Sequence, residues 1–218
     1  MKTIVSFIFE SMTEIDELYH GMSYYGEGSL NAVEADPETR EVAFRHWERV
    51  FCYELYHKVK SKIEREIEEK RDVKYWQNIT FTAELQKQEL SEMKLSLLDL
   101  QQLEHRYIPD FLFHRIDNAD NQELIVEVKT KVNLDYASIK GDLVKIHEFL
   151  VRYRYKNGLF ILDNNSMEYV IRLLREHIED LSFLEAFGER ITILCYKFQD
   201  KKVETCKISM IFQGQGGK

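Results

Sequence analysis

The feature that most constrains the fold is a strand–helix–strand succession between residues 122 and 163. Residues 122–130 contain the apolar run LIVEVK, residues 138–155 carry a helical pattern, and residues 158–163, GLFILD, form a short apolar run. Two strands joined through a helix are predicted to be parallel neighbours with a right-handed crossover. The chain is therefore predicted to be an α/β protein built on a central sheet.

Further elements are predicted on both sides of this unit. Asp36-Pro37-Glu38 resembles a helix start, with Asp as the N-cap, and the helix should run to about residue 70. Other predicted elements are a strand at 77–85, a helical insertion at 85–105, a strand at 107–115, a helix at 166–181 and a closing hairpin of 190–199 with 203–212. The Asp- and Asn-rich segment IDNADNQ should join the strands at 107–115 and 122–130 as a hairpin.

Composition supports one domain spanning residues 1–218. A hydrophobic content of 44% in 218 residues is enough for one sizeable core. No Pro/Gly linker or repeat divides the chain, and the tail at 213–218 is expected to be disordered. The net charge of −8 argues against a protein that coats nucleic acid without specificity, although it leaves room for a local basic surface.

The sequence also favours a cytoplasmic location. No apolar run approaches the roughly 20 residues of a membrane span, so no membrane partner is expected. The amino-terminal run breaks into acid at Glu10 without a cleavage pattern, which argues against a signal peptide. Three cysteines lack CxxC spacing, and a turn centred between residues 200 and 201 would set Cys195 opposite Cys206. These two are expected to remain free, buried thiols.

Charged residues interrupt the two apolar strands at 107–115 and 122–130. Because side chains alternate between the faces of a strand, Glu127 and Lys129 share one face, and a hairpin can bring Asp110 to the same surface. One explanation is the solvent-exposed face of an antiparallel sheet. However, a strand that opens a strand–helix–strand unit should be central and covered, and a buried carboxylate needs compensation, for which a metal ion is common.

The residues Pro109-Asp110 and Glu127-Val128-Lys129, followed by a helix and a short apolar strand, resemble the PD-(D/E)XK nuclease superfamily over residues 38–163. The resemblance implies a restriction-endonuclease-like core, a mixed central sheet flanked by helices, here with a helical insertion and an elaboration at 164–212. It also implies a divalent metal, Mg²⁺ or Mn²⁺, held by Asp110, Glu127 and the carbonyl of Val128, with Lys129 as the catalytic lysine.

The superfamily often adds a glutamate from its first core helix. Glu54 and Glu48 both flank the apolar stripe of the helix at about 38–70, and Glu54 is preferred because of its spacing from Phe51. The alternative is that either glutamate only borders a helix–sheet contact.

Several cations are candidates for contacts with nucleic acid. Arg152 and Arg154 alternate with tyrosines in RYRYK, which suits phosphate contact and base stacking, although such a run is also typical of a cationic helix end with its aromatics in the core. Lys131 and Lys145 are further candidates; Asp142 and Lys145 lie on the helix after the Glu-x-Lys strand.

The predicted function is Mg²⁺-dependent hydrolysis of phosphodiester bonds, by an endonuclease that acts on DNA. RNA as the substrate and a homodimer as the assembly remain open alternatives. A different class of function is also kept: a nuclease-fold protein that no longer cuts and instead serves as a nucleic-acid or protein interaction module.

Overall fold

The computed structural model describes residues 4–20, 37–84, 92–115, 122–198 and 200–213, without the side chains at 17–18, 37–47 and 92–94. The predicted disordered tail at 213–218 lies almost wholly outside the described residues, as do the turn at 116–121 and Asp36. The helices are α1 (Ile4–Thr13), η1 (Glu17–His20), α2 (Pro37–Glu68), α3 (Val73–Trp76), α4 (Glu92–Leu97), α5 (Tyr136–Arg152), α6 (Met167–Glu176), η5 (Ile178–Phe187) and α7 (Ser209–Phe212).

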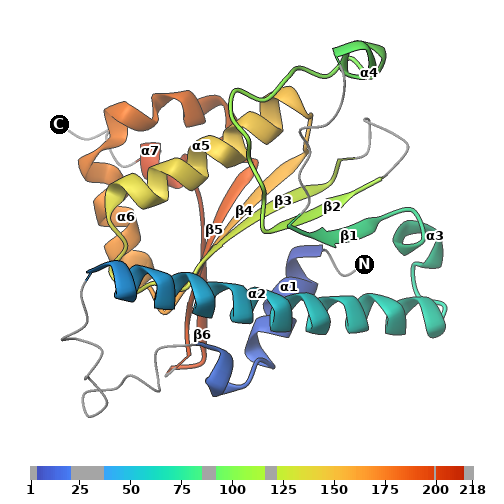
Figure 1. The fold of residues 1–218 in the computed structure, drawn as a ribbon, viewed down its shortest axis with the longest axis horizontal. Coiled ribbons are helices and arrows are strands. Elements are labelled where there is room, and N and C mark those ends of the chain that lie inside the picture. Colours follow the sequence, from blue (N-terminus) through green and yellow to red (C-terminus); the bar gives the residue numbers. More distant parts are fainter. Residues whose placement is uncertain (1–3, 21–36, 85–91, 116–121, 199, 214–218) are drawn as a thin grey trace.

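A single mixed sheet forms the centre of the described structure (Figure 1). Its strands are β1 (Thr80–Ala83), β2 (Phe111–His114), β3 (Leu124–Lys129), β4 (Asn157–Asp163), β5 (Ile191–Lys197) and β6 (Lys202–Lys207), in that spatial order. The pairs β3–β4 and β4–β5 are parallel, and the remaining pairs are antiparallel. The predicted α/β class, the β2–β3 antiparallel pairing and the parallel β3–α5–β4 unit are confirmed.

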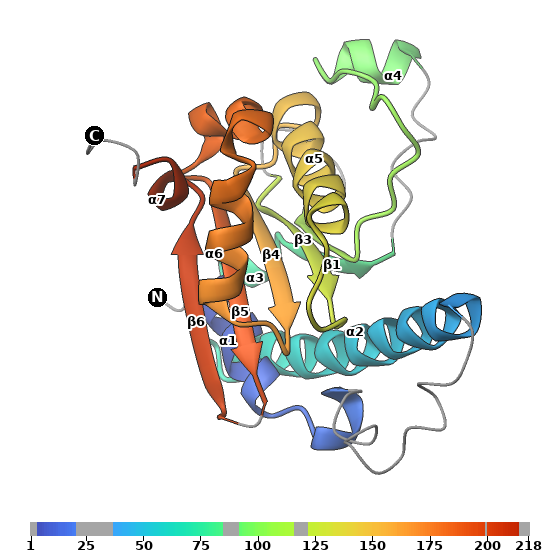
Figure 2. The same cartoon turned by 90° about the vertical axis from the view of Figure 1, so that its left-hand side faces the viewer.

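Helices cover both faces of this sheet, which gives three layers (Figure 2). One face packs against α5, α6, η5 and α7 through strand residues such as Ile125, Phe160 and Ile193. The other face packs against α1, α2 and α3, and its strand residues include Val126 and Val128. The alternation of side chains along β3 therefore separates the two cores, and Glu127 falls on the face covered by α5.

Close packing between β4 and α5 depends on one glycine. A side-chain carbon at Gly158 would collide with Cγ2 of Ile146, which is fully buried on α5. The absence of a Cβ at this position lets the helix approach the strand that it precedes.

The closing hairpin differs from its predicted register. Ile193 pairs with Cys206 and Cys195 pairs with Glu204, so the prediction that the two cysteines lie opposite each other is wrong. The loop extends from residue 198 to residue 201, and Lys201 adopts a positive φ of 46°, so the connection is longer than the assumed tight turn. Both thiols are nevertheless free and buried, as predicted.

The end of the predicted hairpin is also wrong. The expected strand at 203–212 stops at Lys207, and the short helix α7 follows. Gly188 lies against the backbone of Ser209, whose N–H donates to the Gly188 carbonyl over 3.2 Å. The Ile208 N–H donates to the carbonyl of Ile191, the first residue of β5, so residues 209–212 have no further part of that strand to pair with.

Candidate functional site

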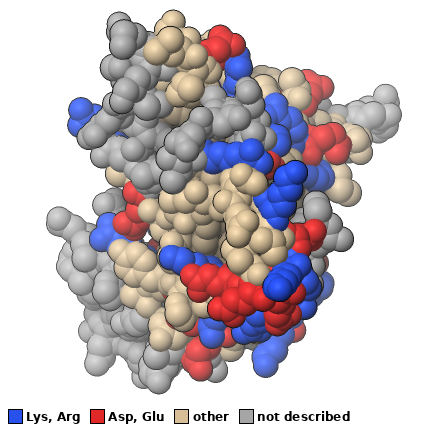
Figure 3. All heavy atoms as spheres, turned by 90° about the vertical axis from the view of Figure 1, so that its right-hand side faces the viewer, with Lys and Arg blue, Asp and Glu red and all other residues tan. Residues whose placement is uncertain are grey.

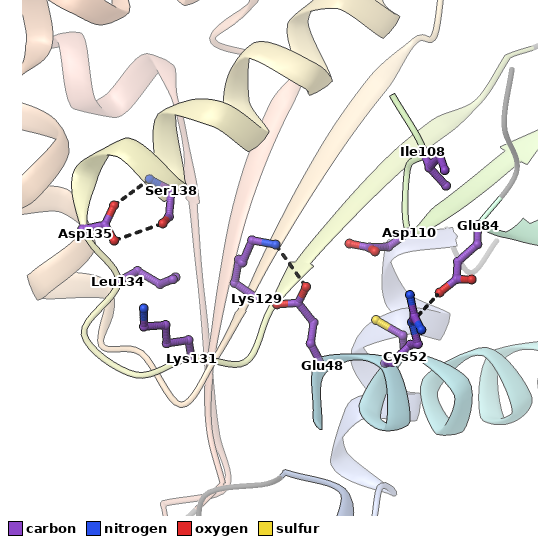
Figure 4. A pocket seen from close by; sticks show the side chains of 11 residues that line it. Glu48, Cys52, Glu84, Ile108, Asp110, Lys129, Lys131, Leu134, Asp135 and Ser138 are labelled. Carbon is purple, nitrogen blue, oxygen red and sulfur yellow. Dashed lines mark hydrogen bonds and ion pairs between the residues drawn. The ribbon is translucent and has the colours of Figure 1, made fainter. Parts of the chain in front are cut away.

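The candidate site lies in a cleft of about 540 Å³ at the carboxyl end of β3 (Figure 4). Side chains from α2, β3, the segment before β2 and the start of α5 line it. Its lining is Glu48, Arg49, Cys52, Glu84, Ile108, Asp110, Lys129, Lys131, Leu134, Asp135 and Ser138.

Strand pairing places Asp110 next to β3. Phe111 pairs with Val126, and the Asp110 carboxylate accepts a hydrogen bond from the Val128 N–H through Oδ2 over 2.8 Å. Burial raises the pKa of Asp110, although Lys145 and Lys129 act in the opposite direction. The predicted convergence of Asp110 with the Glu-x-Lys strand is therefore seen in this hydrogen bond.

Glu127 is the most deeply buried charged group of the site. Its exposure is 0%, because it lies in the middle of the sheet beneath α5. Oε2 accepts a hydrogen bond of 2.5 Å from Lys145 Nζ, whereas Oε1 is buried without a hydrogen-bond partner in the described part of the chain. Burial and the charge of Asp110 raise the pKa of Glu127 well above its ordinary value, despite the neighbouring Lys145.

Lys129 lines the cleft and is held from two sides. Its Nζ lies 3.1 Å from Glu48 Oε1 on α2 and 3.4 Å from Asp142 Oδ2 on α5. Burial alone would lower the pKa of Lys129, but Asp142, Glu48 and Asp110 outweigh it and raise the pKa. Lys129 is therefore a fixed, fully protonated ammonium at ordinary pH.

Of the two candidate helix acids, Glu48 lies at the cleft and the preferred Glu54 does not. Glu54 pairs with Lys58 on its own helix, with Nζ 3.4 Å from Oε1, and it does not line the cleft. Glu48 lines the cleft and binds Lys129 (Figure 4). The two residues are six apart, which places them on different sides of α2, and this placement favours Glu48 over Glu54.

Of the four predicted nucleic-acid contacts, the structure places only Lys131 in the cleft lining. Lys145 points into the site from α5, where it binds Glu127 and lies 3.3 Å from Asp142 Oδ1. Lys145 is therefore an internal group of the site, a placement that does not favour its predicted phosphate contact.

Arg152 and Arg154, the two arginines of the RYRYK run, lie at the opposite end of α5 from the cleft. The helix has 17 residues and so is about 25 Å long, and its first turn borders the cleft. Arg152 donates to the Gln102 carbonyl and binds Glu148, and Arg154 pairs with Asp99. Tyr153 and Tyr155 are buried, so this run has the form of a cationic helix end with its aromatics in the core, and a nucleic-acid contact by the two arginines stays a prediction.

A second buried polar pair lies at the carboxyl end of β4. His20 Nδ1 on η1 is 3.0 Å from Asp163 Oδ1, and both side chains are buried. Asn165 connects this end of β4 to the cleft segment, since its Nδ2 donates to the Lys131 carbonyl over 2.8 Å. This pair was not predicted from the sequence. The available signal was Asp163, an acid at the end of the otherwise apolar run at 158–163.

The thiol in the cleft is not an activated nucleophile. Burial raises the pKa of Cys52 well above its ordinary value, and the nearby carboxylates Asp110 and Glu48 act in the same direction. A thiol in such an acidic, buried environment stays protonated and inert. The chemistry of the cleft is therefore that of its carboxylates and ammonium groups.

The donor atoms of the site suit a hard divalent cation. Among the described residues, no group of three or more His, Cys, Asp or Glu side chains could hold a metal ion. Two carboxylates, a backbone carbonyl and waters are nevertheless a set that Mg²⁺ accepts, because it usually retains several waters. Oε1 of Glu127 is buried without a hydrogen-bond partner, and a bound cation would supply the partner that this oxygen lacks.

Comparison of the chain with protein-family models, with curated proteins and with solved structures finds no match. Within the described residues, no helix is both long enough and apolar enough to cross a bilayer.

Proposed function

We propose that the protein is a divalent-metal-dependent nuclease of the PD-(D/E)XK type that hydrolyses phosphodiester bonds in DNA. The observation that carries the proposal is Glu127, a carboxylate with 0% exposure and one orphaned oxygen beside a second carboxylate. A buried, incompletely paired carboxylate costs several kcal/mol, and structures retain such groups mainly where function needs them.

The order of elements adds support. The antiparallel pair β2–β3, the crossover helix α5 and the parallel strand β4 follow the order expected of a restriction-endonuclease-like core. The charged residues Asp110, Glu127 and Lys129 fall at the positions that this core would use.

Each residue has a defined part in the proposed reaction. Asp110, Glu127 and the carbonyl of Val128 would hold the cation. When bound there, Mg²⁺ would lower the pKa of a water molecule and neutralise charge on the scissile phosphate. Lys129 stabilises the charge that develops on the phosphate, and Glu48 fixes the position of its ammonium group.

Three cations, Arg49, Lys129 and Lys131, line the cleft together with four carboxylates, so the lining would attract the scissile phosphate only once a divalent cation is bound. Figure 3 shows a different face, where α2 ends, and acidic and basic side chains are interspersed on it. The described part of that face offers no continuous basic track for a DNA backbone.

The experiment is a cleavage assay on linear and supercoiled DNA with Mg²⁺, with Mn²⁺ or with EDTA. Wild type should cut only with metal, Glu127→Gln should be inactive, and Glu54→Gln should keep activity because its carboxylate lies outside the cleft. Metal-independent cleavage would contradict the metal proposal. Metal binding without cleavage of DNA or RNA would favour the alternative, a non-cutting interaction module.

A further inference from the structure

The proposed nuclease site contains a continuous chain of alternating charges that reaches beyond the assigned ligands. Glu48 binds Lys129, Lys129 also lies against Asp142, Asp142 also lies against Lys145, and Lys145 binds Glu127. Each lysine is thus shared between two carboxylates, and Asp142 is shared between both lysines.

The charges in this cluster do not balance. Glu48, Asp142, Glu127 and the adjacent Asp110 are four carboxylates, which face only the two ammonium groups. Fully ionised, the cluster carries a net charge of −2, equal and opposite to one divalent cation. In the metal-free protein, the ammonium of Lys145 is the group that compensates Glu127.

The position of Lys145 suits compensation of the Glu127 charge and not contact with substrate. Its side chain is 18% exposed, it does not line the cleft, and its shortest contact is the 2.5 Å bond to Glu127 Oε2. The second contact, 3.3 Å from Asp142 Oδ1 one helical turn away, is longer. The ammonium therefore has a second acceptor within reach on its own helix.

We propose that Lys145 is an internal counter-ion of the site: a divalent cation bound by Glu127 displaces the Lys145 ammonium, and Asp142 receives it. This inference rests on the proposed metal site and adds Lys145 and Asp142 to it as positioning residues. It follows from the cost of leaving Glu127 uncompensated when the ion is absent, and from the repulsion between an ammonium and a divalent ion that share one carboxylate.

The coupling between the two cations should be antagonistic and measurable. A cation at Oε1 of Glu127 is repelled by the Lys145 ammonium at Oε2 of the same carboxylate, so it binds more weakly than it would without that ammonium. Loss of a charge-assisted hydrogen bond of this kind corresponds to about ten-fold or more in affinity.

The first experiment measures Mn²⁺ binding to the purified full-length protein by isothermal titration calorimetry, without nucleic acid. Lys145→Met should bind Mn²⁺ about ten-fold or more tightly than wild type, and its metal-free form should melt at a lower temperature. Lys140→Met is the matched control, since Lys140 lies on the same helix but pairs with Asp180. It should leave the affinity unchanged.

The second experiment needs no removal of the ammonium. The protein is labelled with ¹³C-lysine, and the NMR resonance of the Lys145 ε-carbon is assigned by its loss in Lys145→Arg. In wild type this resonance should move on titration with Mg²⁺, whereas the resonance of Lys140 should not. A Lys145 resonance unmoved at saturating Mg²⁺, or a Lys145→Met variant that binds Mn²⁺ equally or more weakly, would overturn the displacement. Wild type that binds no Mn²⁺ would instead overturn the proposed metal site, and the displacement with it.

Discussion

Glu127→Gln should make the metal-free protein more stable at neutral pH, by an amount that grows with pH. Glu127 is fully buried, and burial together with Asp110 raises its pKa well above the unfolded value of 4.5. A carboxyl whose folded pKa is raised binds its proton more tightly in the native state. The native state is therefore favoured below the unfolded pKa and loses stability as pH rises toward the folded pKa.

The magnitude follows from proton linkage. Between the unfolded and folded pKa values, one such group costs up to about 1.4 kcal/mol of unfolding free energy per pH unit. For a chain of this length, the melting temperature should shift by up to about 3–6 °C per pH unit. Glutamine has the same shape as glutamate and no charge. The difference in unfolding free energy between the variant and wild type therefore isolates the contribution of Glu127 ionisation, apart from a smaller change in the ionisation of Asp110.

The assay is thermal unfolding in EDTA at pH 5, 6 and 7 for wild type, Glu127→Gln and the control Glu54→Gln. The gap between Glu127→Gln and wild type should widen with pH, whereas the control should run parallel to wild type because Glu54 pairs with Lys58 outside the cleft. A gap that does not change with pH, or a variant less stable at every pH, would show that Lys145 already compensates Glu127 fully and would refute the reasoning.

Three further predictions concern single side chains. Lys129→Met should abolish metal-dependent DNA cleavage and lower the unfolding free energy by about 1–3 kcal/mol, because it leaves Glu48 without its partner; retention of wild-type cleavage rates would contradict the assignment. Glu48→Gln should reduce cleavage more than Glu54→Gln, and equal rates would contradict the choice of helix acid. In denaturant unfolding, Gly158→Ala should lower the unfolding free energy by about 1–3 kcal/mol, because the added methyl group collides with Ile146. Gly141→Ala has open space around its Cβ position and should raise the unfolding free energy by up to about 1 kcal/mol. Equal effects of the two substitutions would contradict the packing of α5 on β4.

The central part of the fold could be predicted from the sequence because its signals are local. Alternation along β3 and the strand–helix–strand order determine which face Glu127 occupies and which strands are parallel neighbours. The hairpin from β2 then brings Asp110 to the same end of the sheet. These steps need only periodicity and chain direction.

The remaining features depend on tertiary placement that no local pattern records. Glu48 and Glu54 both border the apolar stripe of α2, and only the position of the helix on the sheet decides between them. Likewise, the hairpin register depends on the conformation of Lys201, and the partner of His20 lies 143 residues away in sequence. The tyrosines of RYRYK are in the core because α5 ends there, which composition alone could not distinguish from a stacking surface.

The measurement that tests the proposed function most directly is the anomalous diffraction of a crystal soaked in Mn²⁺. The proposal predicts a peak about 2.1 Å from an oxygen of Asp110 and from Oε1 of Glu127, with the two carboxylates roughly 4–6 Å apart. The Lys145 ammonium should have moved toward Asp142. The absence of a peak in the cleft, or a separation of more than about 10 Å between the two carboxylates, would contradict the metal site and the nuclease proposal that depends on it.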